Sequence, residues 1–327
     1  MDEQKGFLVQ RSTAGVVIFD AYVPRIIERA GTNARRRFLE YFTADIRNAG
    51  TREAYARAIG RFLDWCDECG CQLEDINPIV VSSYIELLAH RVRAPTVKMH
   101  LAAIRKLFDY LVLGQITPTN PAASVRGPKH VVKKGKTPVL TAGEARQLLD
   151  SIDVSTISGA RDRALIGVMV FSFARVSAVI GMNVEHYFAQ RRRMWFRLRE
   201  KGGKDHDVPA HRKAEDYVEA YLDAAVIRDE LSRPLFRTVD CRRKLTATRV
   251  DRGDVLRMVK RRAKRAGITS RVCCHTMRAT GITAYLENGG SVEHAMNIAN
   301  HESIRTTKLY DRRSDAPSLE EIERIRI

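Results

Sequence analysis

The sequence predicts a mostly α-helical protein, in which an all-α helical bundle precedes an α+β domain with a small β-sheet. Three observations lead to this fold class. The chain has 327 residues, enough for two domains. Residues 32–120 carry apolar side chains at helical spacing. The second half combines further helical segments with two short strand-like runs that are joined by a glycine-containing turn.

The first 120 residues account for the bundle. Residues 1–31 are expected to form an irregular arm around a strand-like run at 15–19. Four helical stripes follow at 34–47, 51–66, 78–88 and 95–111, and Thr51 is the expected cap of the second. Their apolar positions fall on one face, which is typical of a helix packed on a shared core.

A basic linker is predicted at residues 121–138. Three prolines and two glycines interrupt regular structure there, and five cations meet no acidic residue. The segment is interpreted either as a strap along phosphates or as a solvated hinge. The cations are Arg126, Lys129, Lys133, Lys134 and Lys136.

The second domain is expected to begin with a capping box at Thr141 and Glu144. Helices are predicted around 144–151 and 160–173, then a hairpin of strands 194–198 and 206–209, then four more helices. These last helices cover 216–228, 252–266, 275–288 and 292–299.

Charge indicates the kind of partner. Fifty-six Lys and Arg against 39 Asp and Glu give a net charge of +17, which favours a nucleic acid over an anionic membrane surface. Residues 242–271 carry twelve basic residues against Asp251 and Asp254, which favours phosphate contact over a solvated face. The longest apolar run, 164–174, is too short to cross a bilayer, and residues 1–5 lack the pattern of a signal peptide.

Cysteine usage and the acidic residues argue against metal chemistry. Cys66, Cys69 and Cys71 cluster without an evident fourth ligand, so reduced thiols in a cytoplasmic protein are expected. No acidic cluster suits divalent ions, and no phosphate-binding loop is present for ATP. We therefore expect no metal and no cofactor, and phosphoryl chemistry would take its positive charge from side chains.

Spacing supplies the most specific signal. His275 and Arg278 lie at i and i+3, on one face of a predicted helix. His301 follows Arg278 by 23 residues, and Tyr310 follows His301 by nine. Together with the run 173–177, which contains Arg175, and the turn 201–204, this pattern resembles the tyrosine recombinases, the phage-integrase-type site-specific recombinases.

The resemblance implies a role for each matching residue. Tyr310 would attack the scissile phosphate, leaving a 3′-phosphotyrosine and a free 5′-hydroxyl. Arg175 and Arg278 would clamp the non-bridging oxygens, His301 would hydrogen-bond the phosphate, and His275 would assist proton movement at the tyrosine. A tyrosine with a pKa near 10 is a poor nucleophile at pH 7, so the chemistry requires neighbouring cations and a base.

The turn 201–204 and Arg175 remain to be considered, the first for the general acid and the second for a departure from the family pattern. The resemblance implies that Lys201 protonates the departing 5′-oxygen, with Lys204 as the alternative. The family usually has Glu where this chain has Ala178, and that Glu helps to hold the first arginine. We therefore expect the support of Arg175 to be rearranged. Two further departures, at Ala279 and at 299–300, remove no catalytic group.

The resemblance also assigns domains: arm 1–31, helical DNA-clamp domain 32–120, linker 121–138, catalytic domain 139–313, and a tail helix, 314–327, for subunit contact. An apolar stripe in the tail would dock on a neighbouring subunit or pack on its own domain. The candidate DNA-binding residues are Arg126, Lys129, Lys133, Lys134, Lys136, Lys204, Arg243 and Lys244.

The leading hypothesis is a bacterial, nucleoid-associated enzyme that integrates or excises a mobile element. It would act without metal or ATP on a double-stranded recombination site, as a tetramer on paired sites. The sequence leaves open whether accessory DNA-bending or directionality proteins take part. Two alternatives remain open: a type IB topoisomerase-like enzyme that relaxes supercoils, and a DNA-binding regulator without catalytic activity.

Overall fold

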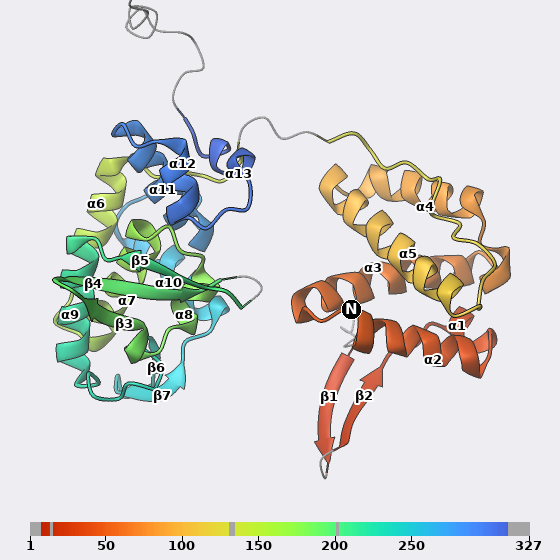
Figure 1. The fold of residues 1–327 in the computed structure, drawn as a ribbon, viewed down its shortest axis with the longest axis horizontal. Coiled ribbons are helices and arrows are strands. Elements are labelled where there is room, and N and C mark those ends of the chain that lie inside the picture. The colour runs from red at the N-terminus through yellow and green to blue at the C-terminus, as the bar shows by residue number, and fades with distance from the viewer. Residues whose placement is uncertain (1–7, 14–15, 131–134, 201–202, 313–327) are drawn as a thin grey trace, which may run out of the picture. The chain divides into compact units, whose positions relative to one another are not determined.

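The computed structural model describes residues 8–13, 16–130, 135–200 and 203–312. It divides into two compact units, residues 1–131 and 132–327 (Figure 1). Within the described residues, no helix is both long and apolar enough to pass through a membrane.

The first unit is a helical bundle with a hairpin at its start. Strands β1 (Leu8–Thr13) and β2 (Val16–Ala21) pair antiparallel, with Leu8 opposite Ala21. The helices are α1 (Arg25–Arg29), α2 (Thr32–Glu40), α3 (Ala49–Glu68), α4 (Pro78–Arg91) and α5 (Ala94–Leu113). A π-helical turn, Tyr41–Asp45, continues α2.

The bundle core explains these helices. Ile26 and Ile27 of α1 are fully buried in the same cluster as Phe62 and Phe108, so the bundle includes α1, which the sequence assigns to an arm. The side chain of Asn48, and not the expected Thr51, caps α3 by accepting from the Thr51 backbone N–H at 3.0 Å. Helix α3 therefore begins three residues earlier than a cap at Thr51 would place it.

The second unit is mostly helical. Its helices are α6 (Ala142–Asp150), α7 (Ile157–Phe171), α8 (Val176–Gly181), α9 (Arg212–Ala225), α10 (Arg252–Arg265), α11 (Cys274–Glu287), α12 (Val292–Ile298) and α13 (Ile304–Lys308). The predicted capping box is present on α6: Thr141 Oγ1 accepts from the Glu144 backbone at 3.1 Å, and the Glu144 carboxylate accepts in return at 2.8 Å. Helix α7 is buried along nearly its whole length, with α9 and α11 packed against it.

One small sheet holds the expected hairpin. Strands β4 (Arg193–Arg199) and β5 (Asp205–Pro209) pair antiparallel, and β3 (Tyr187–Gln190), which the sequence analysis missed, adds a third strand in the order β3-β4-β5. Phe196 and Val208 lie opposite each other and are both buried. A second ribbon, β6 (Arg237–Val239) with β7 (Leu245–Arg249), was also missed. The predicted fold class is confirmed: an all-α bundle comes first in the chain, and a mostly α-helical unit with small sheets follows it.

Candidate active site

The close crossing of α7 and α11 brings the first arginine to the His275–Arg278 helix turn. A Cβ at Gly281 of α11 would lie 1.9 Å from the Val170 carbonyl oxygen of α7, so only glycine allows this approach. The chain then leaves α7 through Phe173, whose φ is +55°. Arg175 follows as the N-cap residue of α8, and its charge lowers the pKa of both His275 and Arg278 at the start of α11.

Arg278 is the most deeply buried cation of the site. Its guanidinium donates to the Phe173 carbonyl and, from NH2, to the Ala299 carbonyl at 2.6 Å. Its Nε is buried and has no hydrogen-bond partner among the described residues. Desolvation, and then the charge of Arg175, lower the pKa of Arg278 to about 10, so the group remains a cation at neutral pH.

Tyr310 and His275 are in direct contact. The Tyr310 hydroxyl lies 2.7 Å from His275 Nε2, with Tyr310 buried to 7% exposure. Burial raises the pKa of Tyr310, and the nearby charges of Arg278 and Arg175 only partly oppose this. The cations around the tyrosine therefore do not by themselves produce a phenolate in the DNA-free protein. The hydroxyl is a phenol hydrogen-bonded to a base.

His275 is held in its neutral form. Loss of solvent around the ring, and then the charges of Arg278 and Arg175, lower its pKa. The residue as a whole is nevertheless exposed. A neutral imidazole whose Nε2 carries no proton can accept the Tyr310 proton.

His301 packs flat against the same tyrosine. The two rings are stacked at 5.7 Å between centroids and 8° between planes. His301 Nδ1 lies 2.8 Å from the hydroxyl of Thr307, which is fully buried. Burial, followed by the charges of Arg278 and Arg175, lowers the pKa of His301 to about 3. His301 is therefore neutral, and Thr307 fixes the direction of its ring.

The tyrosine-bearing segment is fastened on both sides. Thr283 Oγ1 of α11 donates to the Tyr310 carbonyl at 2.9 Å. The Gly135 N–H donates to the Leu309 carbonyl at 3.0 Å, and Arg312 NH2 donates to the Thr137 carbonyl at 3.1 Å. Residues at the end of the predicted linker thus hold the chain on either side of Tyr310.

Arg175 is supported by an acid that sequence reasoning missed. Its NH1 donates to Glu200 Oε2 at 2.5 Å, and Glu200 lies where β4 ends. Ala178, at the position where the family usually has Glu, is buried in the core. No sequence pattern singles out Glu200, because its partner lies 25 residues away on another element.

The two candidate general acids belong to the turn after β4. Lys201 lies outside the described residues. Lys204 is exposed and directly precedes β5, and its carbonyl accepts from the Glu200 N–H at 3.0 Å. Gly203 has a φ of +77°, which explains a glycine at this point of the turn.

The candidate DNA-binding residues are mostly accessible. Lys133 and Lys134 lie outside the described residues. The other six are exposed: Arg126, Lys129, Lys136, Lys204, Arg243 and Lys244.

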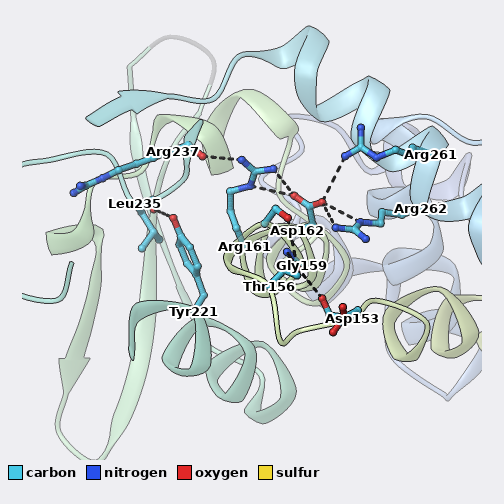
Figure 2. Close-up of polar contacts among 11 residues, drawn as sticks. Asp153, Thr156, Gly159, Arg161, Asp162, Tyr221, Leu235, Arg237, Arg261 and Arg262 are labelled. Carbon is cyan, nitrogen blue, oxygen red and sulfur yellow. Dashed lines mark hydrogen bonds and ion pairs between the residues drawn. The ribbon is translucent and has the colours of Figure 1, made fainter. Parts of the chain in front are cut away.

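The basic stretch 242–271 requires a correction, because two of its arginines hold the fold. Arg262 donates from Nε and NH2 to the fully buried Asp162, at 2.9 and 2.8 Å, and Arg161 donates to the other carboxylate oxygen (Figure 2). Arg249 donates to the carbonyls of Ile180 and Met182. The excess of positive charge available to phosphates is therefore smaller than the sequence count suggests.

Comparison with known proteins identifies the family and agrees with the fold. The phage integrase N-terminal SAM-like domain matches residues 36–115, and the phage integrase model matches residues 138–316. Together they define an enzyme of the tyrosine recombinase class. The chain belongs to the phage integrase family, and the resemblance inferred from the sequence is confirmed.

Individual relatives are distant but cover most of the chain. Tyrosine recombinase XerD of Listeria monocytogenes serovar 1/2a is 26% identical over 267 residues, covering 80% of this chain and 88% of the relative. Tyrosine recombinase XerC of Shigella flexneri serotype 5b is 26% identical over 263 residues, covering 78% and 83%.

Two solved structures share the fold. XerH site-specific recombinase bound to difH substrate, in a pre-cleavage complex, has a TM-score of 0.65 at 15% identity, covering 92% of this chain and 95% of that one. A lambda integrase dimer bound to a COC′ core site has a TM-score of 0.65 at 18% identity, covering 87% and 80%.

Proposed function

We propose that this tyrosine recombinase cleaves and rejoins a specific duplex DNA site through a 3′-phosphotyrosine, to integrate or excise a mobile element. The observation that carries the proposal is the 2.7 Å contact between the Tyr310 hydroxyl and His275 Nε2, beside the buried guanidinium of Arg278. A nucleophile, a neutral base and a cation for the phosphate stand at one point of the second unit.

The proposed chemistry conserves every proton. The Tyr310 oxygen attacks phosphorus while His275 takes the phenolic proton, and the bond to the 5′-oxygen breaks. Lys201, or Lys204 in its place, gives a proton to that oxygen. Arg175, Arg278 and His301 hold the non-bridging oxygens, and Arg278 Nε has no acceptor among the described residues until such an oxygen arrives. Rejoining is the reverse, with a 5′-hydroxyl of a second strand as the nucleophile.

The test uses a suicide substrate, a duplex with a nick next to the scissile bond, so that the short 5′-hydroxyl fragment diffuses away. The DNA flanking the gene supplies the candidate site. Wild-type protein should form a covalent complex at one site, whereas Tyr310→Phe should bind equally well and form none. Cleavage at any position of supercoiled DNA would favour a topoisomerase, and no cleavage anywhere would favour an inactive regulator.

Since side-chain cations supply the charge, we propose that no metal or ATP is needed. Cleavage in EDTA should equal cleavage in buffer, and loss that added magnesium restores would contradict this mechanism. A substrate with sulfur in place of the 5′-bridging oxygen identifies the general acid, because a thiolate leaves without a proton. It should rescue Lys201→Ala; rescue of Lys204→Ala instead would move the role to that residue.

We propose that recombination proceeds in a tetramer on two paired sites, within the bacterial cytoplasm. A lambda integrase tetramer bound to a Holliday junction shares the fold, with a TM-score of 0.62 at 18% identity, and supports this assembly. The predicted tail helix, 314–327, lies outside the described residues. Truncation after Arg313 should preserve single-site binding and abolish paired assembly; unchanged recombination would contradict a connecting role. Recombination by the purified protein alone would exclude a need for accessory proteins.

A further inference from the structure

The ion pair between Arg175 and Glu200 joins two parts of the domain that are far apart in sequence. The Glu200 side chain is 4% exposed, whereas the Arg175 side chain is 37% exposed. NH1 of Arg175 is bound to the carboxylate, and no other partner of this guanidinium occurs in the described part of the chain. The acid therefore holds one edge of the guanidinium and leaves the rest open to a ligand.

The two arginines of the site are supported in different ways. Arg278 donates to two backbone carbonyls, which fix its guanidinium from both sides. No such carbonyl partner of Arg175 occurs within residues 8–13, 16–130, 135–200 and 203–312, and the side chain of Ala178, one turn along α8, carries no acceptor. Across the described residues, Glu200 is the one hydrogen-bond and ion-pair partner of the Arg175 guanidinium.

The backbone that carries Glu200 is itself fixed. Its N–H donates to the Lys204 carbonyl at 3.0 Å, and its carbonyl accepts from the Gly203 N–H at 3.1 Å. The carboxylate thus projects from the closed end of the β4–β5 hairpin, and a side chain of another length would not reach Arg175 at the same place.

We propose that Glu200 is a positioning residue for Arg175. From the end of β4, Glu200 supplies the support that a Glu at position 178 usually gives in this family. The proposal rests on the proposed function of Arg175 as a phosphate clamp. It assigns Glu200 no contact with the DNA.

Charge and position make opposite predictions for this acid. Glu200 cancels part of the positive charge that would bind the phosphate, so by charge alone its removal would strengthen phosphate binding and speed cleavage. If Glu200 instead holds Arg175 in place, its removal slows cleavage by roughly ten- to a hundredfold, the usual cost of a misplaced catalytic group.

The experiment measures single-turnover cleavage of the suicide substrate by the full chain. Glu200→Gln and Glu200→Asp should both be slower, because the amide lacks the charge and the shorter acid lacks the reach. The control is Glu230→Gln, which removes the acid that pairs with the buried Arg237 at 2.9 Å, on a different part of the domain. It should cleave like the wild type.

A second substrate tests whether Glu200 acts through Arg175. In this substrate a methyl group replaces one non-bridging oxygen of the scissile phosphate and removes the negative charge that Arg175 neutralises. The losses of cleavage rate in Glu200→Gln and Arg175→Ala should therefore become smaller together. The double variant should be no slower than Arg175→Ala. Wild-type rates in Glu200→Gln, faster cleavage, or additive defects in the double variant would overturn the proposal.

A measurement without catalysis separates this proposal from the proposed function. Rotation of the Arg175 guanidinium about its Cζ–Nε bond, measured by NMR in the DNA-free Tyr310→Phe protein, should be slow with Glu200 and fast with Gln. Equal rotation in both proteins would refute the positioning role whatever the enzyme does to DNA. Wild-type failure to cleave any DNA would instead refute the proposed function.

Discussion

Replacing Gly135 by alanine should slow cleavage while sparing DNA binding. Gly135 lies at the end of the linker and donates its N–H to the carbonyl of Leu309, the residue before Tyr310. A Cβ at position 135 would lie 2.3 Å from that carbonyl oxygen and 3.2 Å from its carbon. Both contacts are with backbone, so no side-chain rotation relieves them.

The size of the effect follows from this overlap. A carbon and an oxygen in contact prefer a separation of about 3.5 Å, so relief requires that one segment move by about 1 Å. If the Leu309 side moves, the Tyr310 hydroxyl moves with it and loses its 2.7 Å contact with His275. A displacement of about 1 Å at a reacting group costs roughly a hundredfold in rate.

The assay is single-turnover formation of the covalent complex, with DNA binding measured separately by fluorescence anisotropy. Gly143→Ala is the matched control, because a Cβ there meets nothing nearer than the Thr141 hydroxyl at 3.9 Å. A Gly135→Ala protein that melts like the wild type and cleaves at its rate would refute the idea that the linker end positions the nucleophile.

Three further predictions concern stability and binding. Folding lowers the pKa of His301 from 6.5 to about 3, so between these pH values the unfolded chain binds a proton that the folded chain does not. The free energy of unfolding should therefore fall as the pH drops from 6.5 toward 3. This fall should be less steep in His301→Asn. Arg262→Ala leaves the buried Asp162 short of a partner and should cost about 3–5 kcal/mol in denaturant unfolding, whereas Arg257→Ala, at an exposed pair, should cost under about 1 kcal/mol. A similar loss from both would contradict the structural role of Arg262. Neutralising three exposed linker cations should lower the slope of log affinity against log salt by at most about 2.7, and an unchanged slope would make the linker a plain hinge; the three are Arg126, Lys129 and Lys136.

The sequence predicts what is local. His275 and Arg278 share a helix face because helical spacing is regular, and the capping box on α6 depends on residues three apart. The hairpin β4–β5 follows from its turn and its apolar alternation. The sequence also indicates, through Ala178, that Arg175 lacks its usual support, although it does not indicate the replacement.

What the sequence cannot predict depends on contacts between distant segments. Glu200 meets Arg175 across 25 residues, and Asp162 meets Arg262 across 100. A basic helix therefore looks uniformly available for phosphate until the fold places a buried carboxylate against one of its arginines. Strand β6 was missed for a different reason, because a three-residue strand is too short to show alternation.

The buried Nε–H of Arg278, which meets no acceptor in the part of the chain that the structure describes, has a consequence for how such a protein evolves. A buried donor that lacks an acceptor costs about 1–3 kcal/mol until a ligand supplies one. A substitution that supplied an internal acceptor would make the folded chain more robust and would occupy the donor that a phosphate oxygen needs. Selection for durability and selection for recombination therefore oppose each other at this one atom.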